Sequence, residues 1–269
     1  TAQSLVDKTQ KKIDRINDEL NNFAENDIKV PAGAVDAYNA YETAFETWYR
    51  DKTPENKKVS DQAADKMYQV LFQGDYGEGL NKFNSSKFDE DQRVNVNNLT
   101  QDQMDELNAF TADMINKARK AWGTDKTAGL VKPTTGVINM ANEIAQGYRT
   151  DNWSIAKGHN VSRISAAAGE MGLETGDNYY ENAGEGYLWL NNANGDTTMD
   201  ALKGAIYNSI TAMLFNDGRS GNGHMRALLG LMHEDGLETL PADQRVTYFG
   251  ASVNTLPGSV LMQNHFILV

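Results

Sequence analysis

Apolar residues recur at helical spacing along the first third of the chain. Between Val6 and Phe23 they follow steps of seven, three, four and three residues, which is an a/d seam interrupted by a threonine. A second run places apolar and aromatic residues on one face over residues 35–48, and a third run covers residues 59–70. Prolines and a glycine separate the runs. The pattern predicts three helices, packed either as an antiparallel bundle or as the end of a coiled-coil stalk.

The rest of the chain begins with further helical signals. Residues Thr100 to Gln103 fit a capping box, and apolar residues then continue at helical spacing until Gly123. The same spacing predicts helices over about residues 137–148 and 198–215.

The pattern changes towards the end of the sequence. Residues 245–253 are rich in Val, Tyr, Thr and Phe, and residues 259–269 are largely apolar and β-prone. Pro257-Gly258 between them is a strong turn signal, so the two segments predict a β-hairpin. Helices followed by a terminal hairpin imply a domain of mixed helix and sheet layers.

Composition divides the chain at about Val96. Charged residues make up about a third of residues 1–96 and under a fifth of residues 97–269, whereas 19 of the 23 glycines lie in the second part. A charged, glycine-poor segment beside a glycine-rich one predicts a helical, stalk-like segment over 1–96 joined to a compact domain over 97–269.

The overall composition excludes several function classes. With 25 basic and 37 acidic residues, the formal charge of −12 argues against binding to nucleic acid or to an anionic membrane. The chain has no cysteine, which excludes disulfides, thiolate metal sites and cysteine nucleophiles. No apolar run reaches the roughly 18 residues that a transmembrane helix needs.

Candidate chemistry is concentrated in three glycine-rich, polar segments, residues 157–160, 180–186 and 215–224. They contain His159 and His224 together with several carboxylates, and each lies at the edge of a predicted element, where loops present functional side chains. Two histidines with two or three carboxylates can bind a divalent cation or perform acid–base chemistry. The spacing alone matches neither a His-Glu-x-x-His motif nor a nucleophile elbow.

The order of these motifs resembles the CAP domain, which is shared by cysteine-rich secretory, antigen-five and pathogenesis-related proteins. A helix with Met140-Ala141 and Tyr148-Arg149 is followed by a histidine, then by Ala183-Gly184-Glu185, a long amphipathic helix, Gly223-His224 and a hairpin. The resemblance implies an α+β fold, a three-layer α-β-α CAP-like sandwich. It also implies a set of catalytic and metal-binding residues, which are His159, Glu185, Asp217 and His224.

A narrower resemblance covers about residues 97–269. The runs Leu99–Gln103, Ile115–Arg119 and Met213–Asp217 are similar to PgrA-type surface exclusion proteins of Gram-positive bacteria. These proteins are anchored to the cell wall, carry helical stalks and are related to conjugation. The resemblance therefore implies an extracellular location at the cell surface, and the absence of cysteine agrees with a bacterial member rather than a disulfide-rich eukaryotic one.

The chain departs from the family pattern at several positions. Glu185 is followed by glycine instead of the usual asparagine, and Asp217 stands where eukaryotic members often have glutamate. Glu181 is an alternative fourth ligand. Of the remaining histidines, His233 is expected in a solvated acidic turn and His265 in a strand with a local hydrogen bond.

Two functions from different classes follow. The first is a metal-assisted, peptidase-like hydrolase with zinc or calcium, in which Glu185 could serve as a general base if no metal is bound. The second is a non-enzymatic adhesion or exclusion module on a helical stalk, in which exposed aromatic residues recognise a cell-surface protein or peptide, namely Trp153, Tyr179, Tyr180 and Trp189. The helical segment also allows self-association.

Overall fold

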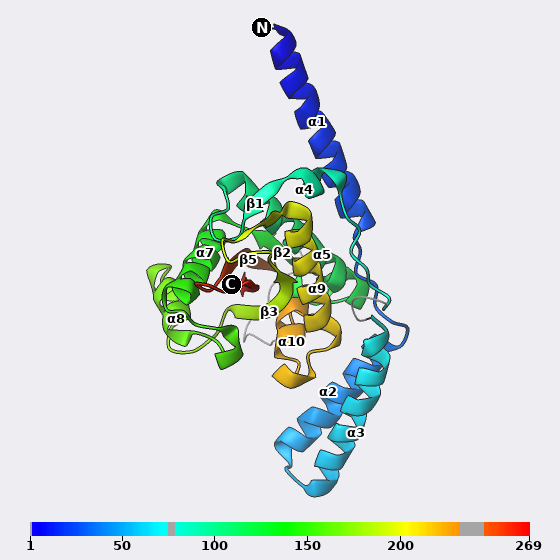
Figure 1. Cartoon of the computed structure of the whole chain (residues 1–269). Coiled ribbons are helices and arrows are strands. Elements are labelled where there is room, and N and C mark those ends of the chain that lie inside the picture. The colour runs from blue at the N-terminus through cyan, green and yellow to red at the C-terminus, as the bar shows by residue number, and fades with distance from the viewer. Residues whose placement is uncertain (1, 75–78, 232–244) are drawn as a thin grey trace.

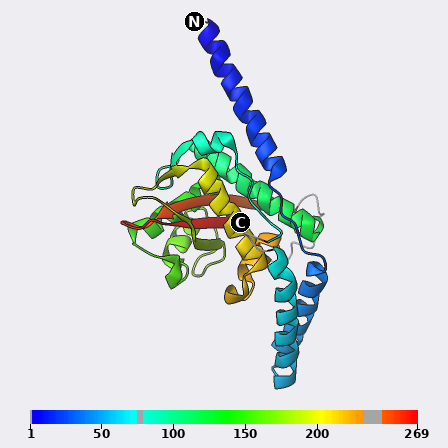
Figure 2. The same cartoon turned by 45° about the vertical axis from the view of Figure 1, so that its right-hand side comes forward.

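The computed structural model describes residues 2–74, 79–231 and 245–269 of the chain. The N-terminal part is helical and comprises α1 (Ala2–Glu25), α2 (Ala34–Arg50), α3 (Pro54–Leu71) and the short helix η1 (Phe72–Gly74). Helices α2 and α3 form an antiparallel hairpin, whereas α1 extends from the body in the opposite direction (Figures 1 and 2). The predicted helices are therefore present, but they do not form a three-helix bundle.

Contacts with the rest of the molecule explain why α1 and the hairpin separate. Near the end of α1, the ring of Phe23 lies 5.8 Å from that of Phe110, and Arg15 forms an ion pair with Glu106. In α2, the buried ring of Tyr38 instead packs edge-on against Trp122, at 6.0 Å. Phe23 of α1 and Tyr38 of α2 thus pack against different rings of the helix-and-sheet domain.

The second part contains the sheet and its covering helices. The helices are α4 (Lys87–Asp91), α5 (Gln101–Trp122), α6 (Asp125–Ala128), α7 (Thr135–Thr150), η2 (Ile155–Lys157), α8 (Val161–Glu170), α9 (Met199–Phe215), η3 (Gly218–Ser220) and α10 (Gly223–Leu229). The strands are β1 (Arg93–Asn95), β2 (Leu130–Pro133), β3 (Glu181–Trp189), β4 (Asp196–Thr198), β5 (Val246–Thr255) and β6 (Leu261–Leu268).

Four strands form the central sheet in the order β2-β5-β6-β3, with β2 parallel to β5 and the other neighbours antiparallel. The predicted C-terminal hairpin is confirmed as the pair β5 and β6 at the centre of this sheet. Strands β1 and β4 form a separate antiparallel pair. Strand β3 is at the edge of the central sheet, so side chains on it can be reached from the flanking loops.

Helices cover both faces of the central sheet. Helices α7 and α8 lie on one face, and α5 and α9 lie on the other (Figures 1 and 2). Alternation along β6 divides the core between the two sides, because Phe266 packs with the α5 and α9 side and Ile267 packs with the α7 and α8 side. The α+β fold is thus confirmed, with two helical layers enclosing one sheet.

The capping box predicted at Thr100 is also confirmed. The Thr100 side chain accepts a hydrogen bond from the Gln103 amide, and the Gln103 side chain accepts one from the Thr100 amide. At the other end of α5, Gly123 has a φ of 82°, a left-handed conformation that glycine adopts without steric cost. The local sequence therefore fixes both ends of the helix that covers one face of the sheet.

A buried group of charged residues connects α4, α5 and α9. The Lys203 ammonium lies 2.7 Å from Asp89 and 2.8 Å from Glu106, and all three side chains are buried. The same ammonium lies over the rings of Phe23 and Phe110, at 5.8 and 5.7 Å. Asp89 thus holds α4 on the domain through a buried ion pair.

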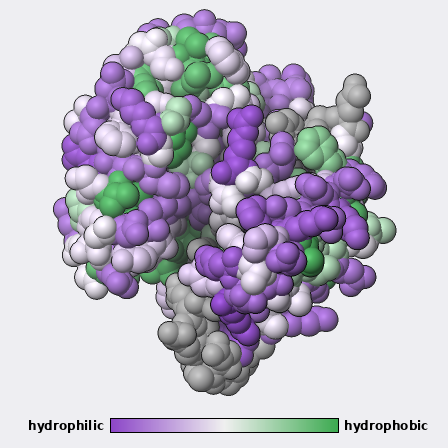
Figure 3. Space-filling view, turned by 90° about the horizontal axis from the view of Figure 1, so that it is seen from below, coloured by the Kyte–Doolittle hydropathy of each residue, from purple (hydrophilic) through white to green (hydrophobic). Residues whose placement is uncertain are grey.

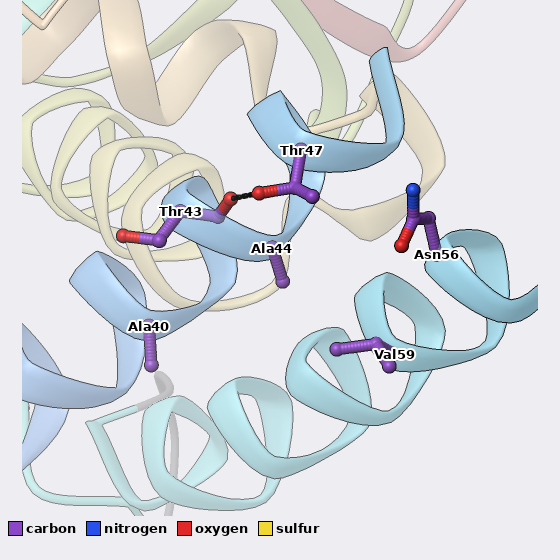
Figure 4. A pocket seen from close by; sticks show the side chains of 6 residues that line it. All are labelled: Ala40, Thr43, Ala44, Thr47, Asn56 and Val59. Carbon is purple, nitrogen blue, oxygen red and sulfur yellow. Dashed lines mark hydrogen bonds between the residues drawn. The ribbon is translucent and has the colours of Figure 1, made fainter. Parts of the chain in front are cut away.

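A cavity of about 430 Å³ opens between the helices of the α2–α3 hairpin (Figure 4). Its lining contains no ionisable side chain and consists of Ala40, Thr43, Ala44, Thr47, Asn56 and Val59. This cavity offers no group for acid–base or metal chemistry. Within the described residues, no helix combines the length and the apolar character required to span a bilayer.

Candidate functional site

The site begins at the loop that presents His159 between η2 and α8. Gly158 has a φ of 90°, and Asn160 caps α8 by accepting a hydrogen bond from the Arg163 amide. The His159 side chain is 28% exposed, and its Nδ1 lies 2.7 Å from Oε2 of Glu181. The glycine and the helix cap thus place the imidazole at the mouth of the site with one nitrogen directed inward.

Glu181, the first residue of β3, is the centre of the buried part of the site. Its carboxylate is fully buried and is contacted by His159, by Nδ1 of His265 at 2.6 Å, and by the hydroxyl of Tyr148, which donates at 2.6 Å. Burial alone would raise the pKa of this carboxyl. The hydrogen bonds from these three residues and the charge of His265 outweigh burial and lower its pKa to about 2. Glu181 is therefore an ionised acceptor.

Tyr148 on α7 links the carboxylate to the backbone of the histidine loop. The Tyr148 oxygen accepts a hydrogen bond from the Asn160 amide at 2.6 Å and donates its own proton to Glu181. Burial raises the pKa of this phenol, with a smaller contribution from the charge of Glu181, so the hydroxyl keeps its proton. The loop of His159 is thus attached to the same carboxylate that orients its ring.

A second carboxylate–imidazole pair forms where α9 leads into α10. Asp217 Oδ1 lies 2.8 Å from Nδ1 of His224, and Asp217 Oδ2 accepts a hydrogen bond from the Met225 amide at 3.1 Å. Asn222, just before the helix, has a φ of 64°, and its Oδ1 accepts a hydrogen bond from the Tyr68 hydroxyl at 2.8 Å. Tyr68 belongs to α3, so the N-terminal hairpin supports the loop that carries His224.

The rings of His159 and His224 lie close together although the two residues come from different parts of the domain. The ring centroids of His159 and His224 are 6.3 Å apart, with 56° between the ring planes. Each Nδ1 is directed at its own carboxylate, which selects the tautomer with the proton on Nδ1 and leaves Nε2 as the available lone pair. Seen from below, the molecule is hollowed between its left and right parts (Figure 3).

Of the residues implied by the family resemblance, His159 and His224 lie side by side, Asp217 contacts His224, and Glu185 contacts Ser154. The Glu185 carboxylate accepts hydrogen bonds from Ser154 Oγ, at 3.2 and 3.4 Å. Glu181, the alternative fourth ligand, contacts His159 directly. Both side chains lie on the same face of β3 because residues an even number apart share a face.

Of the two remaining histidines, His265 and His233, the structure describes only the first. His265 is fully buried in β6, where its Nδ1 contacts Glu181 and its Nε2 contacts Asn254, so the expected local hydrogen bond is present. It belongs to the site through Glu181, a connection that the strand assignment alone does not reveal. His233 lies outside the described residues.

The residues present meet part of the requirement for a metal ion. In carboxylate–histidine–metal arrangements the ligating imidazole donates its other N–H to a carboxylate, as His159 and His224 both do. A metal–nitrogen bond is about 2 Å long, so a centroid separation of 6.3 Å is close to the longest span that one ion could bridge. Among the described residues, no three His, Asp or Glu side chains form a group that could hold an ion.

Comparisons with known proteins bear on the fold. No protein-family model matches the chain, and no curated protein matches it. A solved structure, the CAP domain of Enterococcal PrgA, is similar, with a TM-score of 0.59 and 25% sequence identity over 91% of this chain and 86% of that one. The chain thus has the CAP fold, and the resemblance of its sequence motifs to CAP-domain proteins of the surface exclusion type is confirmed.

Proposed function

We propose that the chain is an extracellular, cell-surface protein whose CAP-like domain carries a metal-assisted, peptidase-like site at His159 and His224. The observation that supports this proposal is the short distance between two imidazoles, each of which is hydrogen-bonded through Nδ1 to a different buried carboxylate. Such an arrangement orients two Nε2 lone pairs without using either carboxylate as a ligand. The substrate class that follows from the resemblance is a cell-surface protein or peptide.

The residues divide into two groups in this proposal. His159 and His224 would hold a divalent cation through Nε2, while Glu181 and Asp217 orient the rings. A bound cation would supply a water molecule with a lowered pKa for hydrolysis. Imidazole nitrogen suits zinc, whereas calcium prefers oxygen ligands, so the donor set favours zinc of the two ions. With only two protein ligands, positions remain open for water and substrate.

Zinc binding tests the metal part of the proposal. Isothermal titration of the wild-type chain should show one zinc ion per chain and much weaker binding of calcium. The double variant His159→Ala/His224→Ala should lose this binding, and Glu143→Gln, an exposed change on α7, should keep it. Equal zinc binding by wild type and the double variant would remove the support for a metal site here.

The second candidate function is a binding module without catalysis. Trp189 is 69% exposed and Tyr179 is 50% exposed, so aromatic side chains are available for recognition, while Trp153 and Tyr180 are partly buried against the core. Incubation with cell-surface proteins, followed by mass spectrometry, separates the two functions. Fragments that disappear in the double histidine variant favour the enzyme, and retention of intact protein favours the module.

Helix α1 supports presentation on a stalk and self-association. Its apolar seam is largely solvent-exposed, with Val6 at 59%, Ile13 at 46% and Leu20 at 61%. An exposed a/d seam is the feature by which helices pair in coiled coils. Sedimentation velocity should show concentration-dependent association that the double variant Val6→Lys/Ile13→Lys abolishes. A monomer at all concentrations would contradict self-association.

A further inference from the structure

Strand β3 has a neighbouring strand on one side only. It is an edge strand of the central sheet and pairs with β6. Just before the strand, the Leu268 amide donates to the Tyr180 carbonyl, and in an antiparallel pair the residues that bond to the partner alternate. Asn182 and Gly184 therefore bond to β6. The backbone N–H and C=O groups of the odd-numbered residues of β3 point to the free edge.

Both ends of this free edge are closed. At Glu181, the Asn178 side chain engages both backbone groups, because its Oδ1 accepts from the Glu181 amide at 2.8 Å and its Nδ2 donates to the Glu181 carbonyl at 2.9 Å. One carboxamide thus occupies the position that a peptide group of a neighbouring strand would have. At the other end, the pairing shifts register between Glu185 and Trp189, and Gly186 has a φ of 87°. Irregularities of this kind protect sheet edges from further pairing.

Between these ends, the edge is open at Ala183 and Glu185. Within the described residues, no hydrogen bond engages the backbone groups that these two residues direct to the free edge. Exposure increases along the strand, from buried Ala183 through partly exposed Glu185 to exposed Gly186, so the edge runs from the surface towards the interior. Unpaired backbone groups at a sheet edge can bind an extended peptide, which adds a strand to the sheet.

The open edge leads to the two histidines. His159 contacts Glu181 at the first residue of β3, and the ring of His224 is 6.3 Å from that of His159. Ala183 is two residues further along the strand, a distance of about 7 Å. The ring of His159 comes from the side of α8 and that of His224 from α10. A peptide paired with Ala183 would therefore bring its backbone close to both imidazoles.

The charge of Glu185 indicates which peptide would fit. Its carboxylate accepts hydrogen bonds from Ser154 Oγ, a neutral group, and in the part of the chain that the structure describes no Lys, Arg or His forms an ion pair with it. Opposite charges on directly opposed residues stabilise neighbouring strands, whereas like charges destabilise them. The residue of the added strand that lies opposite Glu185 should thus be lysine or arginine.

We propose that the free edge of β3 at Ala183 and Glu185 binds an extended peptide as an added strand, with a basic side chain opposite Glu185. As an assignment of the substrate, this rests on the function proposed above, because the paired peptide would lie beside His159 and His224. The pairing itself requires neither the histidines nor a metal ion, so it can be tested in the metal-free chain.

Isothermal titration of the metal-free chain with three peptides tests the pairing. The first is a hexapeptide of alternating threonine and lysine with blocked ends, the second has glutamate in place of lysine, and the third is the lysine peptide N-methylated at every backbone amide. The lysine peptide should bind about fivefold more tightly than the glutamate peptide. The N-methylated peptide should not bind, because it has no N–H to donate. Equal binding of the methylated and unmethylated lysine peptides would overturn the proposal.

Hydrogen exchange of single backbone amides locates the peptide. The lysine peptide should slow exchange at the amides of Ala183 and Glu185 and leave Gly184, which already bonds to β6, nearly unchanged. Slower exchange at another edge or helix instead would overturn the proposal. If the free chain showed slower exchange at Ala183 and Glu185 as its own concentration increased, a second copy would occupy the edge, and the peptide would be the wrong occupant.

Two substitutions at Glu185 separate charge from pairing. Glu185→Gln keeps the edge amide and should bind the lysine and glutamate peptides with similar affinity. Glu185→Pro has no N–H, a change that edge strands accept, and should lose peptide binding. Glu143→Gln, a charge removed on α7, is the control and should bind like wild type. Binding of wild-type strength by Glu185→Pro with a wild-type melting profile would overturn the proposal. If this variant does not fold, the N-methylated peptide makes the same test on the wild-type chain.

Zinc titration of the same samples keeps the two proposals distinct. A chain that binds zinc at the histidines but not the lysine peptide would overturn the strand pairing alone. A chain that binds the lysine peptide with protection at Ala183 and Glu185, but binds no zinc, would support the strand pairing and remove the metal site.

Discussion

The imidazole rings of His159 and His224 lie 6.3 Å apart, and each is held through Nδ1 by a different buried carboxylate. The first ring comes from the loop before α8, and the second comes from the first turn of α10. Two independently oriented imidazoles therefore converge at the edge of the sheet, where β3 begins. This convergence is the basis of the proposed metal-assisted site.

Removal of the Asp217 charge should weaken zinc binding without removing a ligand. In Asp217→Asn, the side chain has only one oxygen for two donors, Nδ1 of His224 and the Met225 amide. One of these hydrogen bonds is lost, so the His224 ring is less well oriented, and zinc affinity should fall about 10- to 100-fold. Isothermal titration measures the change, with Glu143→Gln as the control. Equal affinities for Asp217→Asn and wild type would argue that Asp217 does not orient the ligand.

The N-terminal hairpin should affect the site through Tyr68. In Tyr68→Phe, Asn222 loses the hydrogen bond that its Oδ1 accepts, while the ring that packs beside Gly218 is kept. We expect a loss of about 1 kcal/mol in the free energy of unfolding and a smaller decrease in zinc affinity than for Asp217→Asn. Tyr49→Phe, an exposed change on α2, is the matched control. If both substitutions had the same effect on denaturant unfolding and zinc titration, the hairpin would have no role in holding the loop.

Gly250 on β5 should tolerate no side chain, because the backbone of α7 lies directly against it. A Cβ atom at Gly250 would collide with the backbone carbonyl of Val137, which cannot move without displacing the helix. Gly250→Ala should therefore lower the free energy of unfolding by about 3 kcal/mol or more. In Gly136→Ala, on α7, the new Cβ meets only the flexible end of Met171 at 3.6 Å, and stability should rise by about 0.4–1 kcal/mol. The two variants are compared by their unfolding midpoints in denaturant. Equal midpoints would contradict the steric collision between a side chain at position 250 and α7.

The buried carboxyl of Asp89 should give stability a distinct pH dependence. Burial raises its pKa from 3.8 to about 6, although Lys203 opposes the shift. A raised pKa favours the protonated form in the folded state, so this contribution is present below about pH 4 and is lost as the pH rises through about 6. Two pH units correspond to at most about 3 kcal/mol.

Unfolding free energies measured between these pH values should fall more steeply with rising pH in wild type than in Asp89→Asn. Glu106, which shares Lys203, does not mask the effect. Burial would raise its pKa, but Lys203, Gln92 and Arg15 together lower it below its usual 4.5, so it titrates at lower pH. Parallel pH profiles for wild type and Asp89→Asn would refute the assignment.

Local signals in the sequence predicted much of the fold. The capping box at Thr100 and the glycine at 123 define α5, and Pro257-Gly258 marks the turn between β5 and β6. The edge strand β3 was not predicted, because two glycines and an asparagine give it low β propensity. The course of α1 away from the hairpin was not predictable either, since it depends on contacts between Phe23 and Phe110.

The candidate site was predictable only in part. The motif order led to His159, Glu185, Asp217 and His224, with Glu181 as an alternative. Which of the two glutamates contacts His159 depends on depth in the sheet, since both lie on one face of β3. Glu181 is fully buried and contacts His159, whereas Glu185 is partly exposed and contacts Ser154. The role of His265 depends on pairing across the sheet, which a single sequence does not contain.

The most direct test of the metal site is anomalous diffraction at the zinc absorption edge from a crystal of the chain soaked in zinc. The proposal predicts one strong peak about 2 Å from Nε2 of both His159 and His224, with Nδ1 of each ring still bound to Glu181 and Asp217. A peak elsewhere in the molecule, or none at these two rings at saturating zinc, would contradict it.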